Sequence, residues 1–171
     1  MTTPLREIRA GGVRAVVRDG PEPDAVLCLH GIGNSGRTFA PLLKSPRLAG
    51  WTMLVPDLLG HGDSEKSDDL ECRLDDQVRA CRKLLRQLPH RTVHVIGHSF
   101  GGAVGTLLAA DPDPFQVRSL WSLEGNLIAE DCGLVSRRTA TVSFQKFAAD
   151  HRSEIAKEIE RGGHDACDFL R

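Results

Sequence analysis

The chain of 171 residues is about the size of one ordinary domain, so two complete domains are not expected. Hydrophobic residues make up 40% of it and charged residues 26%, a balance that excludes a disordered chain, a collagen-like chain and a disulfide scaffold. The net charge of −1 gives no overall attraction to nucleic acid or to an anionic membrane, so neither is a predicted partner.

The cysteines and the apolar stretches bear on the compartment. Five cysteines, an odd number without a C-x-x-C pair, favour reduced thiols in a cytoplasm over a disulfide framework or a zinc site. The apolar stretches are far shorter than the roughly 20 residues that a membrane-spanning helix needs. The first residues also lack the apolar segment of a signal peptide. The sequence therefore predicts a cytoplasmic protein with no membrane span and no metal site.

The predicted strands come in two kinds. The first twenty residues predict a β-hairpin, in which Gly11-Gly12 joins two short apolar segments. Four later apolar runs of strand length lack the alternation of a half-exposed strand, as expected for strands buried on both faces of a parallel sheet. These runs are Ala25–Leu29, Thr52–Val55, Val93–Ile96 and Val117–Leu123.

Two helices are predicted between these strands. The first has apolar residues spaced by four and three, with Asp75 and Asp76 in its first turn and Pro89 beyond its end. Its apolar face consists of Leu74, Val78, Cys81, Leu85 and Leu88. The second, Gly101–Ala110, is small and apolar and is predicted to be more buried. The alternation predicts an α/β fold, with a mostly parallel sheet flanked by helices.

The most informative motif is Gly97-His98-Ser99-Phe100-Gly101-Gly102, a G-x-S-x-G sequence between a predicted strand and a predicted helix. A sharp turn there exposes the Ser99 hydroxyl above the sheet, and the flanking glycines prevent collisions between strand and helix. The helix that begins here also directs N–H groups and its positive end toward developing negative charge. Ser99 is therefore a predicted nucleophile; the alternative is a Gly-Ser turn that only caps the helix.

The first glycine-rich loop, His30-Gly31-Ile32-Gly33-Asn34-Ser35-Gly36, allows two interpretations. In a hydrolase, the backbone N–H of Ile32 converges with that of Phe100 on the substrate carbonyl oxygen and forms an oxyanion hole. Alternatively, the glycines spell the dinucleotide fingerprint G-x-G-x-x-G, with Asp57 ending the next strand. They are Gly31, Gly33 and Gly36. The dinucleotide interpretation leaves the Ser99 turn unexplained, so the hydrolase is favoured.

The second loop, Asp57-Leu58-Leu59-Gly60-His61-Gly62-Asp63-Ser64, also carries polar residues. Asp57 is either a buried acid or a turn-former, and the structural role is favoured. His61 lies at the same predicted sheet edge as Ser99, but a histidine between glycines in a loop is more typical of a structural role than of a catalytic base.

Taken together, the three loops resemble those of the α/β-hydrolase fold superfamily in order and spacing, over about residues 5–125. The resemblance implies a serine hydrolase of the esterase, lipase or carbon–carbon hydrolase kind. It implies an acyl-enzyme on Ser99, an oxyanion hole from the amides of Ile32 and Phe100, and no metal or organic cofactor. The implied partner is a small-molecule acyl substrate such as a carboxylic ester. The alternative is a non-catalytic binding module of the same fold.

The resemblance leaves the rest of the triad less well placed. Some members of the superfamily carry the triad acid after the sixth strand, which here corresponds to Glu124. The superfamily places the basic histidine after an eighth strand, and we expect this chain to stop before the seventh. His61 and His164 are the weaker alternatives for the base. His151 is predicted to face solvent, and His90 and His94, near the fifth strand, are predicted to be structural. The side chain of His98, directly before Ser99, is predicted to point away from the Ser99 hydroxyl.

Two expectations concern the organisation of the chain. Residues 1–125 are expected to form the amino-terminal part of the α/β core, and residues 126–171 to begin a helical cap or lid. The strand Val117–Leu123 is expected to be an edge strand of a portion of a larger fold. Because an apolar edge strand invites pairing, a second copy of the chain is one predicted partner.

Overall fold

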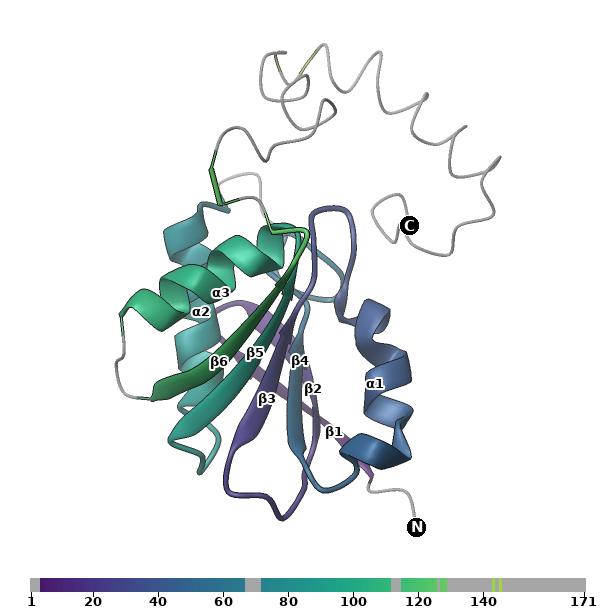
Figure 1. Ribbon diagram of the computed structural model, residues 1–171. Coiled ribbons are helices and arrows are strands. Elements are labelled where there is room, and N and C mark those ends of the chain that lie inside the picture. The colour runs from purple at the N-terminus through teal and green to yellow at the C-terminus, as the bar shows by residue number, and fades with distance from the viewer. Residues whose placement is uncertain are drawn as a thin grey trace.

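A computed structural model describes residues 4–66, 72–111, 115–125, 127–128, 143 and 145. In this part of the chain, six strands form one sheet in the order β1-β2-β4-β3-β5-β6 (Figure 1). The strands are β1 (Leu5–Ala10), β2 (Val13–Arg18), β3 (Ala25–Leu29), β4 (Thr52–Pro56), β5 (Thr92–His98) and β6 (Gln116–Leu123). All six lie where the sequence predicts them, within one or two residues.

The hairpin forms as predicted. Strands β1 and β2 pair antiparallel, with Leu5 opposite Arg18. The two residues of the turn, Gly11 and Gly12, have φ angles of 60° and 80°. Positive φ at both central residues is the geometry of the two-residue turns that match the twist of a hairpin, and glycine adopts it without steric cost. Strand β2 then pairs antiparallel with β4 and joins the hairpin to the parallel strands.

Strands β4, β3, β5 and β6 are parallel, so their carboxyl ends lie at one edge of the sheet. Every residue of β3 and β4 is buried, as predicted for strands covered on both faces. The prediction of two-sided burial is wrong for β5, where buried and half-buried residues alternate, and for β6, which is mostly exposed. Among the described strands, β6 borders only β5, and its Trp121 is 66% exposed. Pairing of this edge with another chain stays a prediction.

Helices cover both faces of the sheet and make three layers (Figure 1). The predicted helices α2 (Leu74–Leu85) and α3 (Phe100–Ala110) lie on one face. The other face is covered by the segment between β3 and β4, which contains the 3-10 helices η1 (Gly36–Phe39) and η2 (Pro46–Leu48) and the short helix α1 (Ala40–Lys44).

Alternate residues of the central strands fill two separate apolar clusters. In β3, Leu27 packs beneath α2 and α3, whereas Val26 and Cys28 pack beneath α1. In β4, Leu54 and Met53 divide in the same way. The continuous apolar runs in the sequence thus reflect a side-chain period of two between two cores.

Helix α2 ends at Leu85, three residues before the end predicted from its apolar spacing. Leu88 is nevertheless buried, because a turn after the helix returns it to the core, with its N–H donating to Leu85 O at 3.0 Å. Pro89 follows and disfavours helical backbone at the residue before it. At the other end, the carboxylate of Asp76 accepts a hydrogen bond from the N–H of Arg73.

The predicted cap over residues 126–171 lies almost entirely outside the described residues, as do His151 and His164. Within the described part, no helix is both long and apolar enough to cross a membrane, and no three acidic, histidine or cysteine side chains are grouped as metal ligands would be. The thiols of Cys28 and Cys81 are unpaired, and burial raises the pKa of each to about 12, which makes both unreactive.

Candidate active site

The strand order brings four loops together at the carboxyl edge of the sheet. From one side to the other they follow β4, β3, β5 and β6, and they begin with Asp57, His30, Ser99 and Glu124. Residues up to 94 positions apart in the sequence thereby lie in neighbouring loops. Open α/β sheets bind their ligands at this edge.

Ser99 stands in a strained turn between β5 and α3. Its φ and ψ are 49° and −118°, a conformation that a residue with a side chain rarely adopts. Two hydrogen bonds hold it there: its N–H donates to Leu123 O at the end of β6, and its carbonyl accepts from Gly102 N–H, both at 2.8 Å. Such a conformation costs on the order of 1–3 kcal/mol and persists only where the surroundings impose it.

The glycines of the motif are required by close backbone contacts, as predicted. A Cβ on Gly97 would collide with the carbonyl of Gly101 in the first turn of α3. A Cβ on Gly101 would in turn collide with the carbonyl oxygen of Leu29 at the end of β3. The helix can therefore begin directly above the strand only because both positions lack side chains.

The hydroxyl of Ser99 is available for chemistry. It does not cap helix α3, and the side chain is half-buried at the sheet edge. It makes no hydrogen bond to any residue that the structure describes. The lack of a capping hydrogen bond argues against the alternative prediction, a serine that only caps the helix.

The first loop lies against Ser99. A Cβ placed on Gly31 would come within 3.2 Å of the Ser99 Cβ, so Gly31 and Ser99 are in direct contact. The next residue along the loop is Ile32. Its backbone N–H, like that of Phe100 beside Ser99, has no hydrogen-bond acceptor among the described residues. This is ordinary for Phe100 at the start of a helix, and Ile32 lies in an exposed turn of the loop.

His30 joins the first loop to the second. The side chain is completely buried; its Nε2 accepts the N–H of Leu58 at 2.9 Å and its Nδ1 lies 2.8 Å from the carbonyl oxygen of Gly31. Burial lowers the pKa of His30 to about 4, so the ring is neutral at pH 7. The role of His30 is not evident from the sequence, where its only signal is its place directly before the first glycine of the loop.

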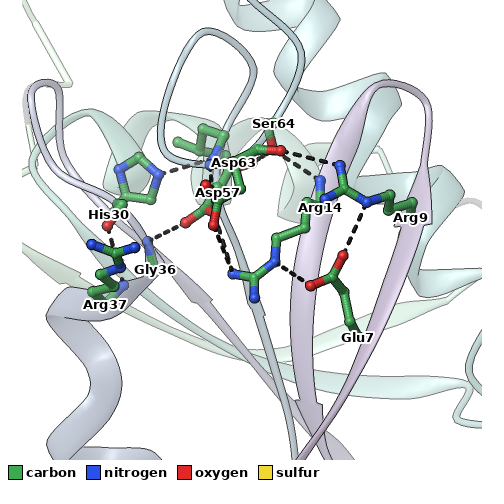
Figure 2. Close-up of polar contacts among 11 residues, drawn as sticks. Glu7, Arg9, Arg14, His30, Gly36, Arg37, Asp57, Asp63 and Ser64 are labelled. Carbon is green, nitrogen blue, oxygen red and sulfur yellow. Dashed lines mark hydrogen bonds and ion pairs between the residues drawn. The ribbon is translucent and has the colours of Figure 1, made fainter. Parts of the chain in front are cut away.

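Asp57 joins the same two loops by its carboxylate, as the structural interpretation predicts (Figure 2). The buried Oδ1 accepts the N–H of Gly36 at 2.7 Å, and Oδ2 accepts that of Asp63 at 3.0 Å. The dinucleotide interpretation requires Asp57 free for a ribose. Here its carboxylate is engaged within the protein, which argues against that interpretation.

The hairpin braces the second loop from the side. Arg14 lies between Glu7 and Asp57, at 2.8 Å and 3.4 Å, and its N–H donates to Ser64 Oγ (Figure 2). The hydrogen bond from Arg14 is the main reason that the pKa of Glu7 is lowered. On the far side, the buried amide of Gln77 in α2 both donates to and accepts from the backbone of Leu59. Neither contact is evident from the sequence.

His61 and Glu124, two other positions considered for the catalytic triad, lie in the loops after β4 and β6. His61 has Nδ1 2.9 Å from Leu59 O and places its ring edge-on to His30, with 5.1 Å between centroids. Glu124 follows β6 with a φ of 52°, and its carboxylate lies 3.6 Å from Nε2 of His98 while remaining 87% exposed. No histidine in the described ranges forms a hydrogen bond to Ser99 Oγ.

The remaining histidine of β5 belongs to the opposite end of the sheet. His94 has Nδ1 2.7 Å from Ser119 Oγ and Nε2 3.5 Å from the carboxylate of Asp24, which also pairs with Arg118. Its ring packs edge-on against Trp51. These contacts fit the predicted structural role.

The chain is similar to known hydrolases in sequence and in fold. The chain is 40% identical over 110 residues to lipase LipV of Mycobacterium tuberculosis, covering 64% of this chain and 40% of that one. It is 32% identical over 108 residues to lipase 3 of a Moraxella species, covering 62% and 33%. The structure of the epoxide hydrolase CorEH matches with a TM-score of 0.62 and 28% identity, over 71% of this chain and 43% of that one.

The chain thus spans about a third of the length of the Moraxella lipase and 40% of LipV. A family model described as the alpha/beta hydrolase fold matches residues 24–148, which include the described loops from His30 to Glu124. On the match of the family model, the order of the strands and the Ser99 turn, the chain belongs to the alpha/beta hydrolase fold family.

Proposed function

We propose that this protein is a serine hydrolase that cleaves a carboxylic ester or a related acyl compound through an acyl-enzyme on Ser99. One observation carries the proposal. The hydroxyl of Ser99 is held by a strained turn beside two backbone N–H groups, those of Ile32 and Phe100, that donate to no described residue. Backbone strain of this kind costs free energy and concentrates where a site is organised for a ligand, and the two N–H groups are free to donate to one.

The proposed reaction has two steps, acylation of Ser99 and hydrolysis of the acyl-enzyme, and the same groups act in both. Ser99 Oγ attacks the acyl carbon, a histidine accepts its proton, and the amides of Ile32 and Phe100 stabilise the oxyanion. The leaving alcohol takes that proton from the histidine. Water then attacks the acyl-enzyme by the same route and releases the acid. The reaction needs no metal or organic cofactor in this proposal.

We propose Glu124 as the acid that orients the histidine. It lies at the carboxyl end of β6, one strand from Ser99, and the N–H of Ser99 donates to the residue immediately before it, Leu123. Its positive φ turns the chain at this point. The base is none of the described histidines whose rings contact neighbouring groups, which are His30, His61, His94 and His98.

The relatives support the class of substrate. LipV and lipase 3, which share 40% identity over 110 residues and 32% over 108 residues with this chain, are lipases by name. Lipases cleave esters, so an ester is the first substrate to test. With unpaired Cys28 and Cys81 in the core, we propose a reducing compartment, the cytoplasm, as the place of this activity.

A fluorophosphonate probe tests the proposal directly, because it forms a covalent phosphonate ester only with an activated serine. We expect one labelled serine, located at Ser99 by peptide mapping, and no label in Ser99→Ala. Ser122→Ala, which removes a hydroxyl from the end of the adjacent strand β6, serves as the matched control and keeps the label. If the wild-type protein binds an acyl ligand but takes no label, the chain is a non-catalytic binding module.

A further inference from the structure

The carbonyl and the N–H of the peptide group between Gly31 and Ile32 differ in their hydrogen bonding. Its carbonyl oxygen accepts from Nδ1 of His30 at 2.8 Å and from the N–H of Asn34 at 3.3 Å. Its N–H, on Ile32, has no acceptor in the described ranges. Because a trans peptide is planar and its C=O and N–H point in opposite directions, whatever fixes the carbonyl also aims the N–H.

His30 is itself fixed at both ring nitrogens. The backbone N–H of Leu58 can only donate, so Nε2 must accept, and the neutral ring carries its proton on Nδ1. The Nδ1 proton is then directed at the carbonyl of Gly31. The ring is completely buried and lies against His61, and Figure 2 shows it turned toward the loop that contains Asp57.

We propose that His30 is a positioning residue, whose Nδ1–H aims and polarises the Gly31–Ile32 peptide so that the Ile32 N–H serves as an oxyanion donor. This inference rests on the proposed function, since it assigns His30 a part in the same reaction. A hydrogen bond to a carbonyl strengthens the N–H of the same peptide as a donor. His30 thus acts on the transition state without touching the substrate.

A purely structural role for His30 would depend on its other contact, the one to Leu58, which ties the two loops together. Gln77 shows what such a role looks like. Its side chain is equally buried and holds the same loop by two hydrogen bonds to Leu59, but it makes no contact with the Gly31–Ile32 peptide. Gln77 is therefore the matched control for His30.

Two substitutions separate the two nitrogens of the ring. The amide of His30→Asn reaches the position of Nδ1 and can donate to Gly31, whereas that of His30→Gln reaches the position of Nε2 and can accept from Leu58. For hydrolysis of p-nitrophenyl acetate by the full chain, we expect kcat to fall about 100-fold in His30→Gln, with KM changed less than about threefold. We expect His30→Asn to stay within about fivefold of wild type.

The control variant Gln77→Met should lower the melting temperature while kcat, per folded protein, stays within about twofold of wild type. If His30→Asn and His30→Gln lose kcat equally, and in step with their loss of stability, the role is structural and the proposal is overturned.

A second measurement does not depend on activity or on the folding of a variant. In the wild-type chain, the ¹⁵N resonance of the Ile32 amide should move as acid protonates His30, because the ring is hydrogen-bonded to the carbonyl of the peptide group that carries this N–H. If the Ile32 resonance does not change as His30 is protonated, the positioning role is overturned. If the resonance responds but Ser99 takes no fluorophosphonate, the proposed hydrolase function fails while the coupling between His30 and Ile32 stands.

Discussion

The loops on the two sides of Ser99 are built in different ways. On the side of β3 and β4, two buried side chains, His30 and Asp57, each join two loops by hydrogen bonds of 2.7 to 3.0 Å to the backbone. On the side of β6, Glu124 is 87% exposed, and its carboxylate lies 3.6 Å from His98. The side that presents the proposed oxyanion donor is preorganised by the core; the side of the proposed acid is not.

This difference predicts how mutations separate stability from activity. A buried polar group that loses its partner costs on the order of 1–3 kcal/mol, and more where the group is charged. An exposed ion pair contributes about 0–1 kcal/mol. Changes among the loops after β3 and β4 should therefore lower stability together with activity, whereas changes at Ser99 and Glu124 should lower activity without lowering stability by more than about 1 kcal/mol.

The largest effect is expected at Ser99 itself. Ser99→Gly should lower the rate of ester hydrolysis by about 10⁴-fold or more, leaving only the contribution of the oxyanion hole. The same change should raise the free energy of unfolding by about 1 kcal/mol, because glycine adopts the φ of 49° without strain.

Ser99→Ala is the companion variant, equally inactive but without the gain in stability, with a change of less than about 1 kcal/mol. Urea denaturation measures the free energy of unfolding of the two variants, and steady-state kinetics measures their rates of ester hydrolysis. Full esterase activity in either variant would remove Ser99 from the mechanism.

Glu124→Gln should come next. If Glu124 orients the base, the amide should lower the rate about 10³-fold, as expected when the group that sets the tautomer and orientation of a catalytic histidine is lost. Because the side chain is exposed, the free energy of unfolding should change by less than about 0.5 kcal/mol.

Asp111→Asn, at another exposed carboxylate, controls for the loss of a surface charge. A Glu124→Gln rate within about twofold of wild type would move the acid to another residue and would leave the exposed side of the comparison without a catalytic role.

Asp57→Ala tests the buried side of the comparison. The substitution leaves the N–H groups of Gly36 and Asp63 without their acceptor and removes the charge that faces Arg14. We expect the free energy of unfolding to fall by about 4 kcal/mol. Asp19→Ala removes an exposed carboxylate that pairs with Arg6 and should cost less than about 1 kcal/mol. Similar losses in urea denaturation of the two variants would mean that Asp57 is not the centre of these loops.

The sequence predicts the strands of the fold closely, because each depends on a local pattern. The turn Gly11-Gly12 and the continuous run Ala25–Leu29 needed no knowledge of the rest of the chain. The motif at Ser99 could also be recognised locally, since the collision that requires Gly97 occurs between β5 and the first turn of α3. The collision that requires Gly101 is not local, because it involves Leu29 in the neighbouring strand β3.

Contacts between loops could not be predicted in the same way. Asp57 binds Gly36 across 21 residues, and His30 binds Leu58 across 28. Nothing in the spacing of these residues marks which donor meets which acceptor, because the distance is closed by the pairing of β3 with β4. For β6, the expectation of burial on both faces was wrong, because the apolar content of a strand does not tell how much of each face other elements cover.

The smallest predicted effect concerns the response of the buried side to acid. The pKa of His30 is about 4 in the folded chain, chiefly because burial disfavours the charged ring, against an ordinary value of 6.5. Between these values the unfolded chain binds a proton that the folded chain does not, so the free energy of unfolding should fall as the pH drops from 6.5 to 4. The loss should reach about 3 kcal/mol and grow no further below pH 4.

Urea denaturation at pH 7, 5.5 and 4.5 measures this loss of free energy of unfolding. In His30→Asn, which cannot take up this proton, the free energy of unfolding should fall less steeply with pH. Equal slopes in the two proteins would show that His30 titrates alike in both states and is not held neutral by the fold.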